Sequence, residues 1–221
     1  MNNISLFEKG DGLKKNKLSR KDREYKRHRG EILEVALYLF SEKGLYAVTM
    51  VDVAKEAEFS VGTIYKFFKN KEDIYKALII EKVSEFQIIL NNAIAQKGTE
   101  LEKISLWVEE KFKIFNENKQ FMKLYLAEAM GVDSNIKVGL KTEIKKMYED
   151  MLNSVEQLFK QSIQKGIIKN ENPHILALTL DGISNTLFFE HIEAPGEHKI
   201  DSELVLKIFF NQIKIADDSN L

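Results

Sequence analysis

The sequence of 221 residues contains no cysteine, two prolines and eleven scattered glycines. The absence of cysteine excludes disulfide frameworks, thiolate catalysis, Cys-ligated zinc and iron–sulfur clusters. The scarcity of proline and the scattering of glycine exclude collagen-like and linker-dominated chains. No run approaches the roughly 18 apolar residues of a membrane-spanning helix. The polar first thirty residues do not have the pattern of a secretory signal, so we expect a cytoplasmic protein.

Hydrophobic residues make up 44% and charged residues 30% of the chain, as in ordinary globular proteins. The charge is unevenly distributed. Residues 1–76 contain 16 Lys or Arg and 12 Asp or Glu, a net charge of 16 − 12 = +4, whereas residues 77–221 contain 17 and 22, a net charge of −5. A basic front half favours contact with a polyanion, although a solvated, disordered tail would give the same pattern.

Apolar spacing and helix-capping residues predict an all-α fold of about nine helices. Gly44, Gly98, Gly131 and Gly166 lie where helices should end, and Pro173 suits the first turn of a helix. No stretch alternates apolar and polar residues for long enough to predict a strand. The expected helices cover residues 22–43, 50–57, 61–67, 71–96, 100–118, 119–130, 136–165, 173–194 and 202–215.

The most informative stretch has two short helices joined by a tight turn. Thr49 and Asp52 have the spacing of a capping box, and Ser60 can cap the following helix. The turn at 58–60 has the length that a helix-turn-helix requires. The side chains that can form one small core around it are Val53, Ala54, Ala57, Phe59, Ile64 and Phe68.

The second of these helices leaves short side chains outward at its beginning, which lets that end enter a major groove. Lys66, Lys69 and Lys71 surround this end and suit contacts with phosphates. The residues left outward are Val61, Gly62, Thr63 and Lys66, together with the hydroxyl of Tyr65.

This stretch resembles the TetR family of transcriptional regulators in the order and spacing of its residues. Glu58 departs from the family pattern, which usually has glycine there. A left-handed backbone at this position would cost a non-glycine residue roughly 1 kcal/mol. The matching residues are Phe40, Gly44, Thr49, Val53, Ala54, Ala57, Ser60, Gly62, Thr63, Ile64, Tyr65, Phe68, Lys71 and Glu72.

The resemblance implies a division of DNA contacts by position. For two of these residues a purely structural role would explain the residue type equally well. Tyr65 could belong to the core, and Thr63 could simply cap a helix. The residues implied to touch phosphates are Thr49, Ser60, Tyr65 and Lys71. The residues implied to face base edges are Val61, Gly62, Thr63 and Lys66.

The resemblance also implies three parts: a flexible basic arm (1–22), a helix-turn-helix domain (23–76) and a ligand-binding and dimerisation domain (77–221). A homodimer would form through residues 173–194 and 202–215, although burial within one subunit would explain the same apolar helices. The implied function is a ligand-responsive transcriptional regulator, most simply a repressor released from a palindromic operator by a small molecule.

Bulky and adaptable side chains in the C-terminal part are candidates for a ligand pocket, and their abundance favours an apolar or aromatic effector. Plain core packing would use the same residue types at the same helical spacing. The candidates are Trp107, Phe112, Phe115, Phe121, Tyr125, Met147, Met151, Phe159, Phe188 and Phe189.

Two other classes of function stay open. The first is an architectural DNA-binding dimer without a ligand, against which the length of the C-terminal part counts. The second is a helical metal-dependent enzyme, because His191 lies between Glu190 and Glu193. A lone histidine near carboxylates more often forms a salt bridge. The sequence contains no nucleophile elbow, phosphate-binding loop or dinucleotide fingerprint, so we expect no catalytic residues and no cofactor.

Overall fold

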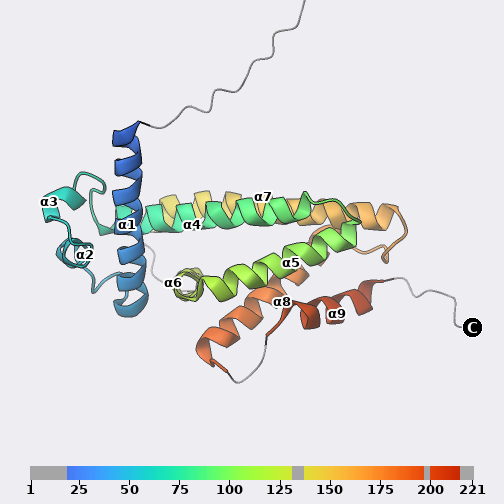
Figure 1. Cartoon of the computed structure of the whole chain (residues 1–221). Coiled ribbons are helices and arrows are strands. Elements are labelled where there is room, and N and C mark those ends of the chain that lie inside the picture. Colours follow the sequence, from blue (N-terminus) through green and yellow to red (C-terminus); the bar gives the residue numbers. More distant parts are fainter. Residues whose placement is uncertain (1–18, 131–136, 197–199, 215–221) are drawn as a thin grey trace, which may run out of the picture.

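The computed structural model describes residues 19–130, 137–196 and 200–214, and this part of the chain forms nine helices. Figure 1 shows α1 standing across one end of a long bundle, with α2 and α3 on its outer side. The helices are α1 (Arg20–Lys43), α2 (Met50–Glu56), α3 (Val61–Ile64), α4 (Lys71–Ile94), α5 (Glu100–Glu117), α6 (Lys119–Met130), α7 (Lys137–Gln164), α8 (Pro173–Glu193) and α9 (Ser202–Ile213). Within the described ranges the only β-type pairing is an isolated bridge between Ile168 and Lys214.

Side-chain caps fix where the first helices begin. Thr49 and Asp52 form the expected capping box at the start of α2. A second capping box, between Ser19 and Asp22, starts α1 at Arg20. Helix α1 therefore begins two residues before the expected helix 22–43, and the expected boundary between arm and domain after residue 22 stays a prediction. The rest of the expected arm, residues 1–18, lies outside the described residues.

The turn of the helix-turn-helix has the left-handed residue that its length requires. Glu58 has φ of 55° and is the only non-glycine residue with a positive φ in the described part. Helix α3 is shorter than the expected 61–67, because the backbone tightens after Ile64. The amides of Lys66 and Phe67 donate to carbonyls three residues back, those of Thr63 and Ile64.

Helix α4 joins the DNA-binding head to the bundle. Asn70 caps its first turn by accepting from the amide of Asp73. Its sides pack against α1, α5 and α7, so its apolar residues belong to two cores at once. Arg29 of α1 pairs with Glu81 of α4, and its guanidinium lies 5.1 Å from the centre of the Phe68 ring. These contacts fix the head to the beginning of α4.

The left-handed backbone at residue 58 gives a stability prediction. A β-branched side chain is poorly tolerated at positive φ, so Glu58→Val should lower the free energy of unfolding by about 1–2 kcal/mol. Glu56→Val, at the exposed last residue of α2, is the matched control and should cost no more than about 0.5 kcal/mol. Urea unfolding of both variants checks this, and equal losses would contradict a special strain at residue 58.

Candidate DNA interface and ligand cavity

The start of α3 is an exposed, well-capped helix end. The Ser60 hydroxyl accepts from the amide of Thr63 at 3.1 Å and lies 2.8 Å from the Thr63 hydroxyl. Gly62 is exposed, and a Cβ there would meet only the Ser60 hydroxyl, at 3.9 Å. The backbone at this end can therefore approach another molecule closely.

The remaining candidates for DNA contact differ in exposure. Tyr65, 55% exposed, and Lys66 face solvent, so Tyr65 does not belong to the core. Val61 is half-buried and packs against the core of the head. The Thr49 hydroxyl donates to the Asp52 carboxylate at 2.6 Å, and hydrogen bonds from Thr49 hold the pKa of that carboxyl below its ordinary value.

Lys71 has a structural role that the sequence did not indicate. Its ammonium donates to the carbonyls of Tyr46 and Val48, both at 3.0 Å, in the loop between α1 and α2. This bond spans more than twenty residues, so no local pattern could have predicted it. The two hydrogen bonds leave one of the three N–H groups of the Lys71 ammonium for a phosphate.

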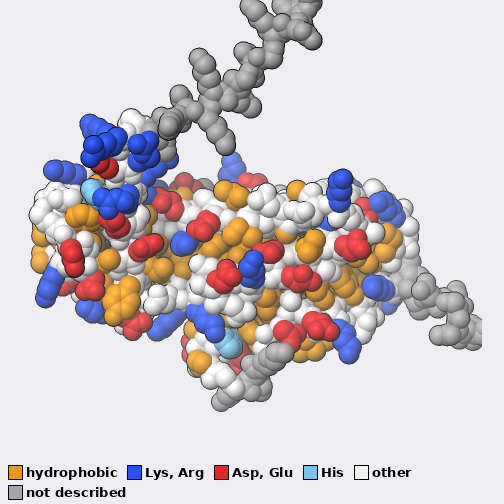
Figure 2. Space-filling view, viewed as in Figure 1, with side chains coloured by type: hydrophobic (Ala, Val, Ile, Leu, Met, Phe, Trp, Pro, Cys, Tyr) orange, Lys and Arg blue, Asp and Glu red, His pale blue; other side chains and the backbone are white. Residues whose placement is uncertain are grey.

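A basic surface lies beside α3. Basic side chains gather at the N-terminal end of α1 in Figure 2. The Tyr25 ring holds this end of α1 against the turn after α3, with its centroid 4.7 Å from that of Phe67. The basic side chains in the first two turns of α1 are Arg20, Lys21, Arg23, Lys26 and Arg27.

Helices α4 to α8 enclose a cavity of about 450 Å³. Its wall is mainly apolar and combines aliphatic, aromatic and methionine side chains from all five helices. The lining residues are Val83, Phe86, Gln87, Leu90, Lys111, Ile114, Phe121, Met122, Tyr125, Ile144, Met147, Tyr148, Met151, Asp181, Asn185, Thr186, Phe188 and Phe189.

The sequence candidates fall into two groups. Six line the cavity: Phe121, Tyr125, Met147, Met151, Phe188 and Phe189. The other four, Trp107, Phe112, Phe115 and Phe159, are buried in the core instead of lining it. Phe115 stacks behind Phe188 with centroids 4.2 Å apart, and Phe159 packs against Phe209 of α9. Periodicity marks such residues as buried but does not distinguish the wall of a cavity from the packing behind it.

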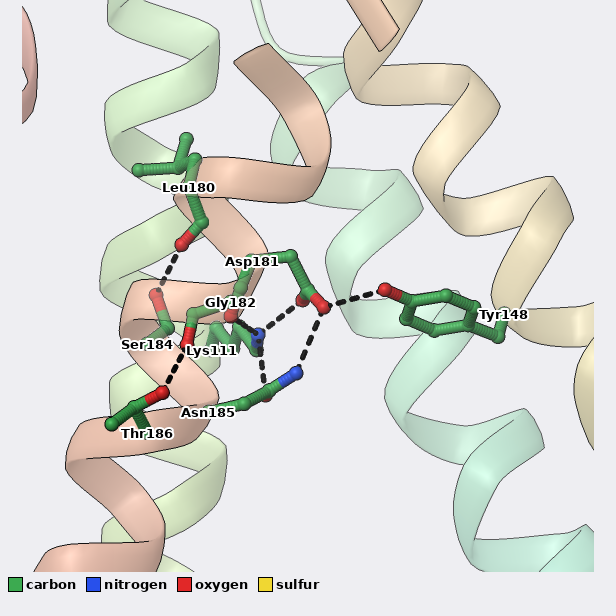
Figure 3. Close-up of polar contacts among 8 residues, drawn as sticks. All are labelled: Lys111, Tyr148, Leu180, Asp181, Gly182, Ser184, Asn185 and Thr186. Atoms are coloured by element: carbon green, nitrogen blue, oxygen red, sulfur yellow. Dashed lines mark hydrogen bonds and ion pairs between the residues drawn. The ribbon is translucent and has the colours of Figure 1, made fainter. Parts of the chain in front are cut away.

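A polar cluster interrupts the apolar wall (Figure 3). Lys111 of α5 forms an ion pair with Asp181 of α8 and donates to the Asn185 side-chain carbonyl at 2.9 Å. The second Asp181 oxygen accepts from the Tyr148 hydroxyl at 2.9 Å and from the Asn185 amide at 2.8 Å. Trp107 lies behind the cluster, with its ring 5.3 Å from the Lys111 nitrogen.

Burial changes the ionisation of this cluster. It lowers the pKa of Lys111, while the adjacent Asp181 carboxylate opposes that shift. Burial and then the Asp181 charge raise the pKa of Tyr148 and of Tyr125, so both phenols stay protonated at neutral pH. Sequence reasoning missed the cluster, because its members come from three helices and only Asp181 and Asn185 are close in the chain.

Helices α8 and α9 are apolar on more than one face. Their inner sides belong to the core, yet four large aliphatic side chains also face solvent. These are Ile175, Leu178, Leu204 and Ile208.

The possible metal site at His191 does not assemble. His191 lies 3.3 Å from the Lys119 ammonium, and Glu190 and Glu193 are exposed. Across the described residues no three metal-ligating side chains come together. None of the described helices is both long enough and apolar enough to cross a membrane.

Comparison with known proteins places the chain in a family. Residues 32–78 match the model for bacterial regulatory proteins of the tetR family. The chain is 30% identical over 139 residues to the fatty acid metabolism regulator protein of Bacillus subtilis, covering 63% of this chain and 70% of that protein. The chain belongs to the TetR family. It is a ligand-responsive DNA-binding transcriptional regulator.

Two further TetR-family proteins show how widely the similarity extends. The chain is 25% identical over 145 residues to the transcriptional repressor KstR2 of Mycobacterium tuberculosis, covering 64% of this chain and 69% of that one. Its fold matches the structure of the regulator FadR from Bacillus subtilis in complex with stearoyl-CoA, with a TM-score of 0.69. That match has 23% identity and covers 81% of this chain and 96% of FadR.

The structural bonds of Lys71, together with the phosphate contact expected of it, give a prediction that separates stability from DNA affinity. Lys71→Ala should cost about 1–2 kcal/mol of stability, because two carbonyls lose a charged donor. It should also lower the salt slope of operator binding by about one unit. The neighbouring exposed Lys69→Ala should lower the slope without the loss of stability. Thermal unfolding and salt-dependent DNA titrations check both, and an unchanged stability of Lys71→Ala would contradict the anchoring role.

Proposed function

We propose that this TetR-family protein is a cytoplasmic homodimeric repressor that an extended, mainly apolar effector releases from an inverted-repeat operator. One observation carries the proposal: the apolar cavity is built from helices that also hold the DNA-binding head. Helix α4 lines the cavity and begins beside the head, and α6 lines the cavity and packs against α1. A catalytic role is not part of this proposal, since the relatives are named as regulators.

The proposed DNA contacts are chosen by how far each side chain of the DNA-binding head is exposed. The open backbone at Gly62 allows α3 to enter a major groove with its first turn leading. Lys66 is exposed and can donate to guanine, whereas half-buried Val61 offers only part of its side chain to a thymine methyl group. Thr63 completes the base-facing set, and Thr49, Ser60, Tyr65 and Lys71 are the proposed phosphate contacts.

The proposed dimer uses the outward apolar residues of α8 and α9. Isolated exposed aliphatic residues are normal, but a group of four on two neighbouring helices suits an interface. A two-fold dimer would place two recognition helices in successive major grooves about 34 Å apart.

A charge in this surface tests the dimer. Ile208→Glu should give a monomer that loses operator affinity, because a buried unpaired carboxylate is costly at an interface. Ile88→Glu is the matched control, since Ile88 is similarly exposed on α4 and lies on neither α8 nor α9. Sedimentation and operator binding check both variants. A dimeric Ile208→Glu protein would move the interface elsewhere.

The cavity indicates the class of effector. Its volume lies within the usual range for small-molecule sites, and its wall carries few polar groups. Methionine, phenylalanine and branched aliphatic side chains suit a long hydrocarbon chain. The fatty acid metabolism regulator relative and the stearoyl-CoA complex of FadR support an acyl chain as effector.

The proposed switch is a population shift. The effector would favour an arrangement of α4 and α6 in which the heads of the dimer no longer match successive grooves. A hundredfold loss of operator affinity needs about 2.7 kcal/mol of coupling, within the ordinary range for allosteric proteins. Linkage requires operator DNA to weaken effector binding by the same factor.

Filling the cavity tests the switch and separates it from a ligand-independent architectural role. Met151→Trp should keep operator affinity within about threefold and abolish its response to a long-chain acyl compound, because the added ring occupies the cavity. Ile88→Trp adds the same ring on the exposed face of α4 and should respond normally. Operator titrations with and without the compound check this. A normal response from Met151→Trp would place the effector elsewhere.

A further inference from the structure

The cavity contains a buried ion pair that an apolar ligand alone does not require. The Lys111 and Asp181 side chains are 11% and 2% exposed. A buried ion pair contributes little to stability and often less than an apolar pair of the same size. Its place in the cavity wall therefore points to a role in recognising the effector.

The pair makes the cavity electrically neutral. Lys111 and Asp181 are the only charged side chains among the lining residues described, and their charges balance. A ligand carboxylate placed beside them would add an uncompensated negative charge in an apolar surrounding. That cost is several kcal/mol for a poorly solvated ion.

The hydrogen bonds within the cluster leave capacity for a neutral group. The two carboxylate oxygens of Asp181 already accept three hydrogen bonds, from Lys111, Tyr148 and Asn185. The hydrogen bond to Asp181 uses one of the two N–H groups of the Asn185 amide. The Tyr148 hydroxyl donates, and its oxygen can still accept. A carbonyl or hydroxyl of the ligand suits these two positions.

We propose that the effector carries an uncharged carbonyl or hydroxyl group that binds at Lys111, Asp181, Asn185 and Tyr148, and that Asp181 makes the cavity reject free carboxylates. This inference rests on the proposed function and names the polar group of the same effector. The second N–H of the Asn185 amide donates to a carbonyl, and the Tyr148 oxygen accepts from a hydroxyl. Lys111 donates to Asp181 and Asn185 and holds both in place. The Asp181 carboxylate balances the Lys111 ammonium, so the cavity offers no unpaired positive charge to a ligand carboxylate.

A matched set of ligands tests the inference on the full chain. Dodecanoate, methyl dodecanoate, dodecanol and dodecane share one chain length and differ in polar group and charge. Trp107 reports binding, because it is the single tryptophan and its ring lies against the Lys111 ammonium. The wild-type protein should bind the methyl ester and the alcohol at least about tenfold more tightly than dodecanoate. It should also bind them more tightly than dodecane.

Removing one charge should reverse the selectivity. Asp181→Asn leaves Lys111 without a counter-charge, so a ligand carboxylate becomes its partner. Relative to the methyl ester, dodecanoate should gain at least about tenfold in affinity. Glu100→Gln is the matched control, because Glu100 pairs with Lys165 at 2.6 Å and does not line the cavity. It should keep the wild-type selectivity.

If Asp181→Asn does not fold, a second variant tests the role of the polar cluster in its place. Lys111→Met combined with Asp181→Leu removes both charges at similar volume, a change that buried pairs often tolerate. The methyl ester should then lose most of its advantage over dodecane, because Asn185 and Tyr148 lose the partners that orient them, and dodecanoate should gain nothing.

Each contrary result has its own meaning. Equal binding of dodecanoate and methyl dodecanoate by the wild-type protein would overturn the charge filter and leave the proposed function standing. An unchanged selectivity in Asp181→Asn, or an undiminished ester preference in the double variant, would overturn the role of the cluster. Failure of all four compounds to bind would overturn the proposed effector class itself, and this inference with it.

Discussion

The structure depends on the packing of one continuous helix, α4, against two different cores. Its first turn is held by Asn70 and by the bonds from Lys71 to the α1–α2 loop, so the head cannot turn independently of it. Further along, Val83, Phe86, Gln87 and Leu90 face the cavity. Because a helix resists bending over this length, a shift at the cavity wall reaches the head as a change of orientation. The Arg29–Glu81 pair adds a second connection through α1.

The buried cluster shows a conflict between stability and recognition. Five helices enclose the cavity, and an apolar residue at 111 or 181 would avoid the cost of desolvating an ion. The chain instead satisfies Asp181 with three donors and places Lys111 near the Trp107 and Phe188 rings, 5.3 and 5.6 Å away. Aromatic faces stabilise a cation, so these two rings add support to the Lys111 charge. The two charges of the cluster are thus partnered before any ligand enters, which makes the cavity pre-organised.

The features that could be predicted from the sequence are those set by neighbouring residues. Capping at Thr49 and Ser60, the helix ends and the left-handed turn at Glu58 all follow from residues within a few positions of each other. The start of α1 is equally local, since Ser19 caps it, and lies two residues before the expected start at residue 22. The cavity was only partly predictable, since burial follows from periodicity but enclosure depends on how five helices cross. The Lys111–Asp181 pair joins residues far apart in the chain, and no pattern in either helix marks it.

Helix α8 connects the two surfaces on which the proposed switch depends. Asp181 and Asn185 face the cavity, while Ile175 and Leu178 face outward on the same helix. In the proposed dimer, the outward residues pack against the partner, so α8 is the least movable wall of the cavity. An effector that binds at the cluster is then held against a fixed helix, and the space it needs is taken from the other helices that line the cavity. Among these helices, α4 and α6 also contact the head. In the proposed switch, the position of the polar cluster on α8 therefore determines which helices move.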